Sequence, residues 1–538
     1  MENRPINQVI EDTIKEALQA LEDPFVFERP ISRVAVIGCG PSGLVAGKTL
    51  KDKGFEVQIF DRGSKVGGNW AYGSKKLEKP FIPRTKEDED HWLKEADPLP
   101  DYVNSTEPIQ VTPEVEEYLL GKHHPPSACY EYLENNTPTP VLGSFEFPWP
   151  KDTPNFVSHA RIQQYYQDFA QHFDLLKHIQ FYTSLEKVEK CENGWELTLL
   201  QVIYLNNGEQ VKFNKYKQTF DAVVLATGQF QYPFMPYTDG LYDFQARFPE
   251  RIFHAKQFIE PEQFEKKKVL VVGGNISSMD IINMLNAVGC DLYLSIRGPM
   301  MTGIPIIDLI RGMLPKNTTV KPGLEGFWSK QGEEKVIDGT VRFTDGTEVE
   351  GFDAIIFATG YISPYSYLGA LRSTPEDIKN ENENSESLTV VTDAKKILNA
   401  YKDIFLIHDP TLAFVGTPKH LTSTPFFDYQ AHAVARVWSK QAVLPSKKLM
   451  KQMVENYVPG CPAFGFNGET ERIRAENIVP WINLHAEKLV PESNLPALKG
   501  PLLQLDDVWQ DGLDNWAKNA TRFFNVVEEK RKLKSNGI

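Results

Sequence analysis

Two segments of the chain share one pattern of apolar and polar positions. Residues 33–62, RVAVIGCGPSGLVAGKTLKDKGFEVQIFDR, predict an apolar strand, a glycine turn, a helix and a second apolar strand that ends on an acid. Residues 268–297, KVLVVGGNISSMDIINMLNAVGCDLYLSIR, repeat this order some 235 residues later. Buried strands that alternate with a helix are typical of βαβ units in a parallel sheet. The chain is therefore predicted to be an α/β protein with two Rossmann-like dinucleotide-binding domains.

The first turn has the spacing GxGxxG. Its first glycine permits the tight turn, its second lets the backbone approach a pyrophosphate, and its third lets helix and strand pack closely. The acid that ends the second strand is placed to accept a hydrogen bond from a ribose hydroxyl, and the following KVGGNWAY allows a second close backbone approach. We expect FAD at this turn, with contacts from Gly38, Gly40, Pro41, Ser42, Gly43, Asp61, Gly68, Asn69 and Trp70.

The second turn keeps only its first glycine. Asn275 stands where the second glycine is expected and Ser278 where the third is. Asparagine tolerates positive φ better than other non-glycine residues, and serine is small, so we expect the turn to survive. Arg297 ends the second strand and can pair with the 2′-phosphate of NADP, although a strand-end arginine is commonly a solvated charge. The expected NADPH contacts are Gly273, Asn275, Ser277, Ser278, Asp280 and Arg297.

Two further segments, FDAVVLATGQF and FDAIIFATGYISP, bracket the second unit. Each predicts a buried strand followed by an Ala-Thr-Gly turn, as expected of two crossings between an FAD domain and an NADPH domain inserted into it. The predicted parts are an N-terminal helical extension (1–30), the FAD-binding domain (31–230 and 361–450), the NADPH-binding domain (231–360) and a C-terminal helical extension (451–538). The insertion at about 75–122 is Pro-rich and highly charged, so we expect a surface loop or a partner contact there.

Composition narrows the function. The net charge of −14 argues against a nucleic-acid surface, and no apolar run is long enough for a membrane span. The five cysteines form no CxxC pair, which argues against a disulfide framework, a zinc site and a dithiol reductase. We find no metal cluster in the sequence, and a reducing cytoplasm is the expected compartment.

Between the two units lies FPERIFHAKQF, in which Phe248, His254 and Phe258 fit the pattern FxGxxxHxxx(Y/F). This pattern is the fingerprint of the flavin-containing monooxygenases, which the chain resembles from about residue 33 to 446. Glu250 departs from it by replacing the glycine, which puts the local turn in doubt. The final aromatic is Phe where Baeyer–Villiger relatives carry Trp. We interpret His254 as a structural residue of the linker that couples the two domains, and not as a general base.

Two further stretches resemble the family. ACYEYLENNTPTPVLGSFEFPWP is similar to its stretch Y-x-x-L-x-x-N-x-P, and Asn136 falls on the family's active-site asparagine. From the residues alone, an exposed turn asparagine is the better interpretation of Asn136, but the resemblance reverses this preference. It implies that Asn136 is the catalytic residue, in contact with FAD, where it orients flavin and nicotinamide. FFDYQAHAVARVWSKQAVLPS resembles the end of the FAD domain, which implies a place near the flavin for Gln430.

The resemblance implies that NADPH reduces FAD, that O2 adds to the flavin at C4a, and that the hydroperoxide oxygenates a soft nucleophilic nitrogen or sulfur of a small molecule. The alternatives are a Baeyer–Villiger monooxygenase or a substrate-specific N-hydroxylase of the same fold, and a flavoprotein that does not oxygenate. The sequence names no substrate, and a homodimer stays open.

Overall fold

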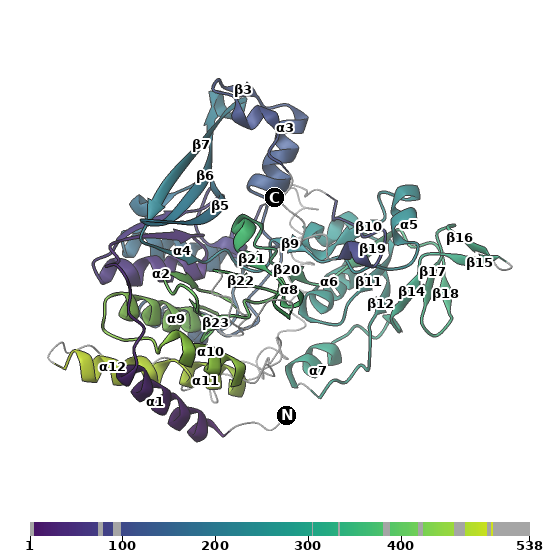
Figure 1. The fold of residues 1–538 in the computed structure, drawn as a ribbon. Helices are drawn as coiled ribbons and strands as arrows, with labels where there is room; N and C mark the ends of the chain where they lie inside the picture. Colours follow the sequence, from purple (N-terminus) through teal and green to yellow (C-terminus); the bar gives the residue numbers. More distant parts are fainter. Residues whose placement is uncertain are drawn as a thin grey trace.

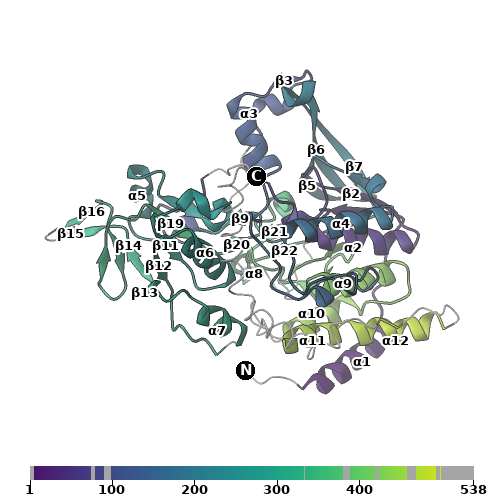
Figure 2. The same cartoon turned by 180° about the vertical axis from the view of Figure 1, so that it is seen from behind.

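The computed structural model describes residues 5–73, 79–89, 98–303, 305–331, 334–379, 388–417, 423–456, 468–491 and 497–498. Two sheets made mainly of parallel strands lie side by side with their helices, and an antiparallel sheet rises from one of them (Figures 1 and 2). The expected α/β class with two Rossmann-like units is confirmed. No helix in this described part of the chain combines the length and the apolar character that a membrane crossing needs.

The first large sheet has the strand order β23-β24-β25-β8-β1-β2-β4. Its bounds are β1 (Arg33–Ile37), β2 (Glu56–Phe60), β4 (Ile179–Gln180), β8 (Ala222–Leu225), β23 (Ala400–Tyr401), β24 (Phe405–Leu406) and β25 (Leu412–Phe414). The strands from β25 to β4 run parallel. One face packs on α2 (Pro41–Asp52), α4 (His159–His172) and α9 (Ser423–Trp438). The other face packs on antiparallel strands, so the apolar runs of β1 and β8 are buried on both sides.

The second large sheet has the order β10-β19-β11-β12-β13, and all its strands are parallel. Its bounds are β10 (Ile252–His254), β11 (Lys268–Val272), β12 (Asp291–Ser295), β13 (Thr319–Lys321) and β19 (Ala354–Phe357). Side chains of α6 (Ile276–Ala287) and α7 (Pro305–Gly312) cover one face. The other face packs on α5 (Leu241–Arg247), β14 (Leu324–Gly326) and β17 (Val341–Phe343). Smaller strands are β15 (Ser329–Gln331), β16 (Glu334–Val336), β18 (Glu348–Val349), β21 (Arg372–Ser373) and β22 (Val390–Val391), and α8 spans Pro375–Lys379.

The chain crosses between the two sheets twice, and the crossings run side by side. After β8 it continues into β9 (Tyr232–Pro233), and after β19 into β20 (Tyr361–Ile362). These two short strands pair with each other, Tyr361 opposite Pro233 and Ile362 opposite Tyr232. The prediction that the two Ala-Thr-Gly segments mark the crossings is therefore confirmed.

From residue 98 on, the insertion forms regular elements and not a surface loop, so that alternative is wrong for this part, whereas a partner contact stays a prediction. Its elements are η3 (Asp101–Asn104), β3 (Ile109–Gln110), α3 (Pro113–Tyr118) and η4 (Leu119–His123). They cover the far end of the sheet made with β5 (Thr183–Cys191), β6 (Gly194–Leu205) and β7 (Gln210–Phe220), as Figure 1 shows. Val103, Val115 and Tyr118 are buried there against the strands. The charged residues between them concealed this apolar set.

Residues 79–89, also from the insertion, contact the unit that holds the second sheet. The side chain of Ile82 is buried in the cluster that contains Leu241 and Phe244. The Arg84 guanidinium lies 4.2 Å from the centre of the Tyr242 ring. This segment therefore links the two Rossmann units in addition to the crossings.

Helices from both ends of the chain pack together. Helix α1 (Ile6–Glu22) lies against α11 (Gly468–Glu476) and α12 (Val479–Leu489), next to α10 (Lys447–Asn456). The buried Lys402 Nζ donates to Glu16 Oε2 at 3.1 Å and to the Asn477 carbonyl at 2.8 Å. Of the predicted C-terminal helical extension (451–538), residues 499–538 lie outside the described part of the chain.

Candidate active site

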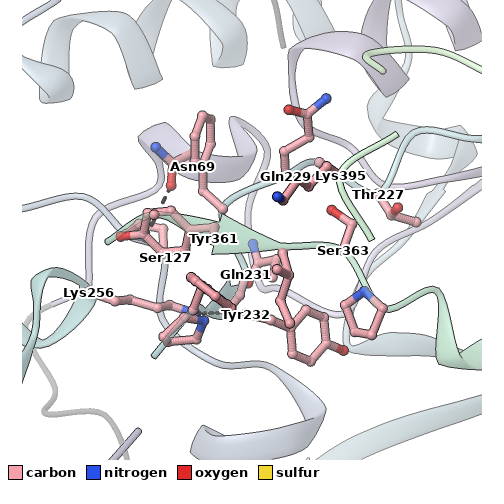
Figure 3. A pocket seen from close by; sticks show the side chains of 18 of the residues that line it. Asn69, Ser127, Thr227, Gln229, Gln231, Tyr232, Lys256, Tyr361, Ser363 and Lys395 are labelled. Atoms are coloured by element: carbon pink, nitrogen blue, oxygen red, sulfur yellow. Dashed lines mark hydrogen bonds between the residues drawn. The ribbon is translucent and has the colours of Figure 1, made fainter. Parts of the chain in front are cut away.

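A cavity of about 2730 Å³ lies where the carboxyl ends of both large sheets meet the crossing strands. One small-ligand pocket commonly measures roughly 300–1,000 Å³, so this cavity has room for more than one ligand. Figure 3 shows part of its wall, in which Gln231 and Tyr361 come from the two crossings.

On the side of the first sheet, two glycine stretches are packed against each other. Gly38 has φ +108°, and a Cβ at Gly43 would lie only 1.8 Å from the Gly38 carbonyl oxygen. A Cβ at Gly68 would lie 2.8 Å from the Cα of Gly40. This bare backbone at the start of α2 fits a pyrophosphate, because helix N-termini bind anions.

Asp61 is held at the rim of this turn. Its Oδ2 accepts from the Cys39 N–H at 2.6 Å and its Oδ1 from the Gly63 N–H at 2.6 Å. Each oxygen keeps a second lone pair, so the carboxylate can also accept from a ribose hydroxyl in the cavity that it lines.

The other residues expected near FAD divide into two groups. Pro41, Ser42, Asn69 and Trp70 line the cavity. The Gln430 side chain is fully buried behind the wall, where its Oε1 accepts from the Gly416 N–H at 2.9 Å and its Nε2 donates to the Thr417 carbonyl at 3.0 Å. Gln430 therefore positions Gly416, which does line the cavity.

The second turn survives, but for a reason other than the expected one. The first glycine has positive φ in both turns, +133° at Gly273 and +108° at Gly38. Asn275 has φ −105° and ψ −173°, so the expectation that it needs positive φ is wrong. It is the extended N-cap of α6, as Gly40 is of α2, and any residue can adopt that conformation.

Only part of the α6 start faces the cavity. Ser277 and Asp280 line it, whereas Ser278 is buried and its Oγ donates to the Asn275 carbonyl at 2.5 Å. The hydroxyl of Ser278 is therefore engaged within its own helix turn, and its expected contact with NADPH stays a prediction. Asp280 accepts from Tyr130 Oη at 2.7 Å, and loss of solvation raises the pKa of its carboxyl to about 6.

Two guanidinium groups border the cavity on this side. Arg297 is exposed, and no ion pair joins it to another residue of the described chain. Arg311, which the sequence did not single out, is buried, and its Nε donates to the Gly274 carbonyl at 2.8 Å. Its Nη1 donates to the Pro299 and Met300 carbonyls, so it holds the loop that follows Arg297.

The adjacent residues Asn135 and Asn136 have different surroundings. The buried Asn135 donates to the Thr137 and Asn155 carbonyls and accepts from the Val157 N–H. Asn136 is exposed and lines the cavity, with its amide unbound to other described residues. The loop thus fixes one asparagine and presents the next one to the cavity.

The linker His254 is fully buried, and both its ring nitrogens are bonded. Its Nδ1 accepts from the Lys256 N–H at 3.1 Å, so its Nε2 carries the proton and donates to the Gly360 carbonyl at 3.0 Å. Burial lowers the pKa of His254 to about 3, which keeps the ring neutral. His254 therefore ties the linker to the second crossing.

The other fingerprint residues are structural as well. Phe258 is buried and stacks on Phe264, while Phe248 packs under the guanidinium of Arg251. Glu250 does not have positive φ, so the turn needs no glycine there. Its Oε1 lies 3.2 Å from Lys79 Nζ in the insertion.

Several cavity residues were not predicted from the sequence. They lie next to the predicted motifs: Ser127, Gln229, Gln231, Lys256 and Tyr361. The sequence offered two signals for such residues. Gln229 directly follows an Ala-Thr-Gly turn, and Lys256 stands two positions after the linker histidine.

Comparison with known proteins agrees with this geometry. A family model described as flavin-binding monooxygenase-like matches residues 126–303 and 328–499, and one for an NAD(P)-binding Rossmann-like domain matches 36–82. The flavin-containing monooxygenase iboF of Amanita muscaria is 31% identical over 496 residues, which cover 86% of this chain and 90% of that protein. This chain belongs to the flavin-containing monooxygenases.

This flavin-containing monooxygenase is an oxidoreductase that uses FAD and NADPH, with O2 and a small molecule as the other reactants. The senecionine N-oxygenase of Tyria jacobaeae is 26% identical over 79% of this chain and 75% of its own length. The solved S-allyl-L-cysteine S-oxygenase of Allium sativum has the same fold, with a TM-score of 0.59, 21% identity and coverage of 94% and 99%.

Replacement of Arg297 tests the site of the 2′-phosphate. We expect Arg297→Ala to raise the KM for NADPH by about tenfold, because a charge-assisted contact to the phosphate is lost. The KM for NADH, which lacks this phosphate, should stay within about twofold. Steady-state kinetics with both dinucleotides measure this difference, and equal effects on the two would exclude Arg297 from the role.

The buried His254 should make stability depend on pH. The unfolded chain protonates this ring near pH 6.5 and the folded chain only near pH 3. Below about pH 6.5 the unfolded state therefore binds more protons, and the free energy of unfolding falls as the pH is lowered. When the pH falls from about 7 to about 5, the free energy of unfolding should decrease in both proteins. The decrease should be about 1–2 kcal/mol smaller in His254→Gln than in the unchanged protein, as measured by denaturant unfolding. Equal losses would show that His254 is not buried neutral.

Proposed function

We propose that this flavin-containing monooxygenase transfers one oxygen atom of O2 to a soft nucleophilic nitrogen or sulfur of a small molecule. The observation that carries the proposal is that both glycine turns open into one cavity, so that the two dinucleotides can meet there. When bound, FAD supplies the redox chemistry that activates O2. The chain supplies binding, orientation and exclusion of water.

The N-termini of α2 and α6 would hold the two pyrophosphates, since the first N–H groups of a helix have no partner within the helix and the helix dipole is positive at this end. Asp61 would accept from the FAD ribose and Arg297 would pair with the 2′-phosphate of NADPH. Asn136 would donate and accept hydrogen bonds between flavin and nicotinamide, which its unbound amide and its place in the cavity support.

A nucleophilic amine or sulfide needs no base to activate it. This agrees with the linker histidine, whose nitrogens are both occupied and whose ring is neutral. Aromatic rings line part of the cavity, and those of Phe230 and Tyr232 are 40% and 43% exposed. Such a wall suits an apolar substrate body and limits the access of water.

Two features support a heteroatom over a ketone as the acceptor. The fingerprint ends on Phe258 and not on tryptophan. The relative from Tyria jacobaeae is named an N-oxygenase. A Baeyer–Villiger enzyme and a single-amine N-hydroxylase are the alternatives.

Cytoplasmic location and a homodimer remain predictions. The described cysteines Cys39, Cys129, Cys191 and Cys290 are free thiols, which supports a reducing compartment.

A product panel tests the proposed reaction. The FAD-loaded enzyme receives NADPH and O2 with a tertiary amine, a thioether or a cyclic ketone, and the products are identified by mass spectrometry. We expect an N-oxide and a sulfoxide, each dependent on NADPH. Lactone from the ketone with no product from the other two would overturn the proposal in favour of Baeyer–Villiger chemistry.

The pair Asn135 and Asn136 separates structure from catalysis. Asn136→Ala should keep its FAD and its melting temperature, but divert most of the NADPH that it oxidises into hydrogen peroxide. Asn135→Ala loses three backbone hydrogen bonds and should be destabilised by about 2–4 kcal/mol. Peroxide yield per NADPH and thermal unfolding measure the two effects. Unchanged coupling in Asn136→Ala would reduce Asn136 to a turn residue.

A further inference from the structure

Lys256 is a buried cation in the cavity wall that none of the functions above uses. It lies on η8 (Ala255–Gln257), directly after β10, and its residue surface is only 4% exposed. Its Nζ donates to the Gln231 carbonyl at 2.5 Å (Figure 3). Within the described parts of the chain, no carboxylate forms an ion pair with this ammonium.

An ammonium without a counter-ion is costly to bury, because the protein replaces little of its hydration. Burial lowers the pKa of Lys256 to about 7, and the positive charge of Arg62 acts in the same direction. One carbonyl satisfies one of the three ammonium donors. An anion in the cavity would compensate the positive charge and accept hydrogen bonds from the remaining donors.

The order of the second sheet indicates which anion reaches this place. Arg297 follows β12, Gly273 follows β11, Gly360 follows β19 and Lys256 follows β10. Ligands of such sheets lie across the carboxyl ends of the strands. A dinucleotide with its 2′-phosphate at Arg297 and its pyrophosphate at the start of α6 therefore extends toward β19 and β10 with its nicotinamide half.

Two observations support this path. Helix α6 contacts η8, so the pyrophosphate position and Lys256 belong to one neighbourhood. Tyr361, which follows β19, lines the same cavity as Lys256 and Gln231, as Figure 3 shows. The ammonium thus lies where the sheet meets the crossings, between the expected pyrophosphate and the FAD side.

We infer that Lys256 binds the phosphate of the NADP(H) pyrophosphate that is attached to the nicotinamide ribose. This contact places the nicotinamide half at the crossings. The inference depends on NADPH as the cofactor and not on the choice between nitrogen, sulfur and carbonyl acceptors. A carboxylate of a substrate has related chemistry, and the experiment distinguishes it.

The first test compares two ligands on FAD-loaded protein by titration calorimetry. NADP+ contains the nicotinamide half, whereas 2′,5′-ADP contains only the adenosine half. We expect Lys256→Gln to weaken NADP+ by about tenfold or more and to change 2′,5′-ADP by less than about twofold. Lys256→Arg should bind NADP+ within about threefold of the unchanged protein, because the charge is kept. Lys395→Gln, an exposed lysine of the same cavity, is the matched control and should bind both ligands normally.

If Lys256→Gln binds NADP+ within about twofold of the unchanged protein, the inference is overturned. This holds also if the variant loses only the turnover of an anionic substrate, since Lys256 would then bind the substrate carboxylate. Equal weakening of both ligands would also overturn it, since it would show a general effect on the unit.

A second test needs no variant and serves if Lys256→Gln fails to fold. Nicotinamide mononucleotide carries the phosphate in question, and nicotinamide riboside lacks it. We expect the mononucleotide to bind the unchanged protein about tenfold or more tightly than the riboside. Equal affinities would overturn the inference. Since both tests measure binding, their failure is distinguishable from a failure to oxygenate amines or sulfides.

Discussion

The structure depends on one close backbone approach, which occurs twice. A Cβ on Gly38 would lie 2.4 Å from the Ala226 carbonyl oxygen, and a Cβ on Gly273 would lie 2.5 Å from the Ala358 carbonyl oxygen. In each unit the first glycine of the dinucleotide turn thus lies directly against the alanine that opens an Ala-Thr-Gly turn. Any side chain at either glycine would separate the turn from the neighbouring strand.

This approach connects cofactor binding to the path of the chain. Each Ala-Thr-Gly turn leads straight into a crossing, and the crossings pair with each other. His254 fixes the second crossing through the Gly360 carbonyl, and residues 79–89 add contacts between the same units. The geometry of the two turns is therefore set by the elements that join the two units, which explains why both turns open into one cavity.

Patterns within a short segment were sufficient for the first turn, the second Rossmann unit and the crossings, because a βαβ unit and its glycines are specified locally. Contacts between distant segments were not predictable. The sequence could not show that Gln430 binds Gly416 and Thr417 behind the cavity wall, or that Ser278 turns its hydroxyl onto its own helix. The insertion was misjudged because its apolar residues acquire partners only from β6 and β7, which lie about 100 residues later in the sequence.

The central claim is that FAD and NADPH meet in this one cavity. Anaerobic mixing of the FAD-loaded protein with NADPH tests it most directly, with the flavin absorbance followed by stopped flow. The account predicts that the oxidised-flavin absorbance bleaches as one NADPH is consumed per flavin. Flavin that stays oxidised in the presence of bound NADPH would contradict it.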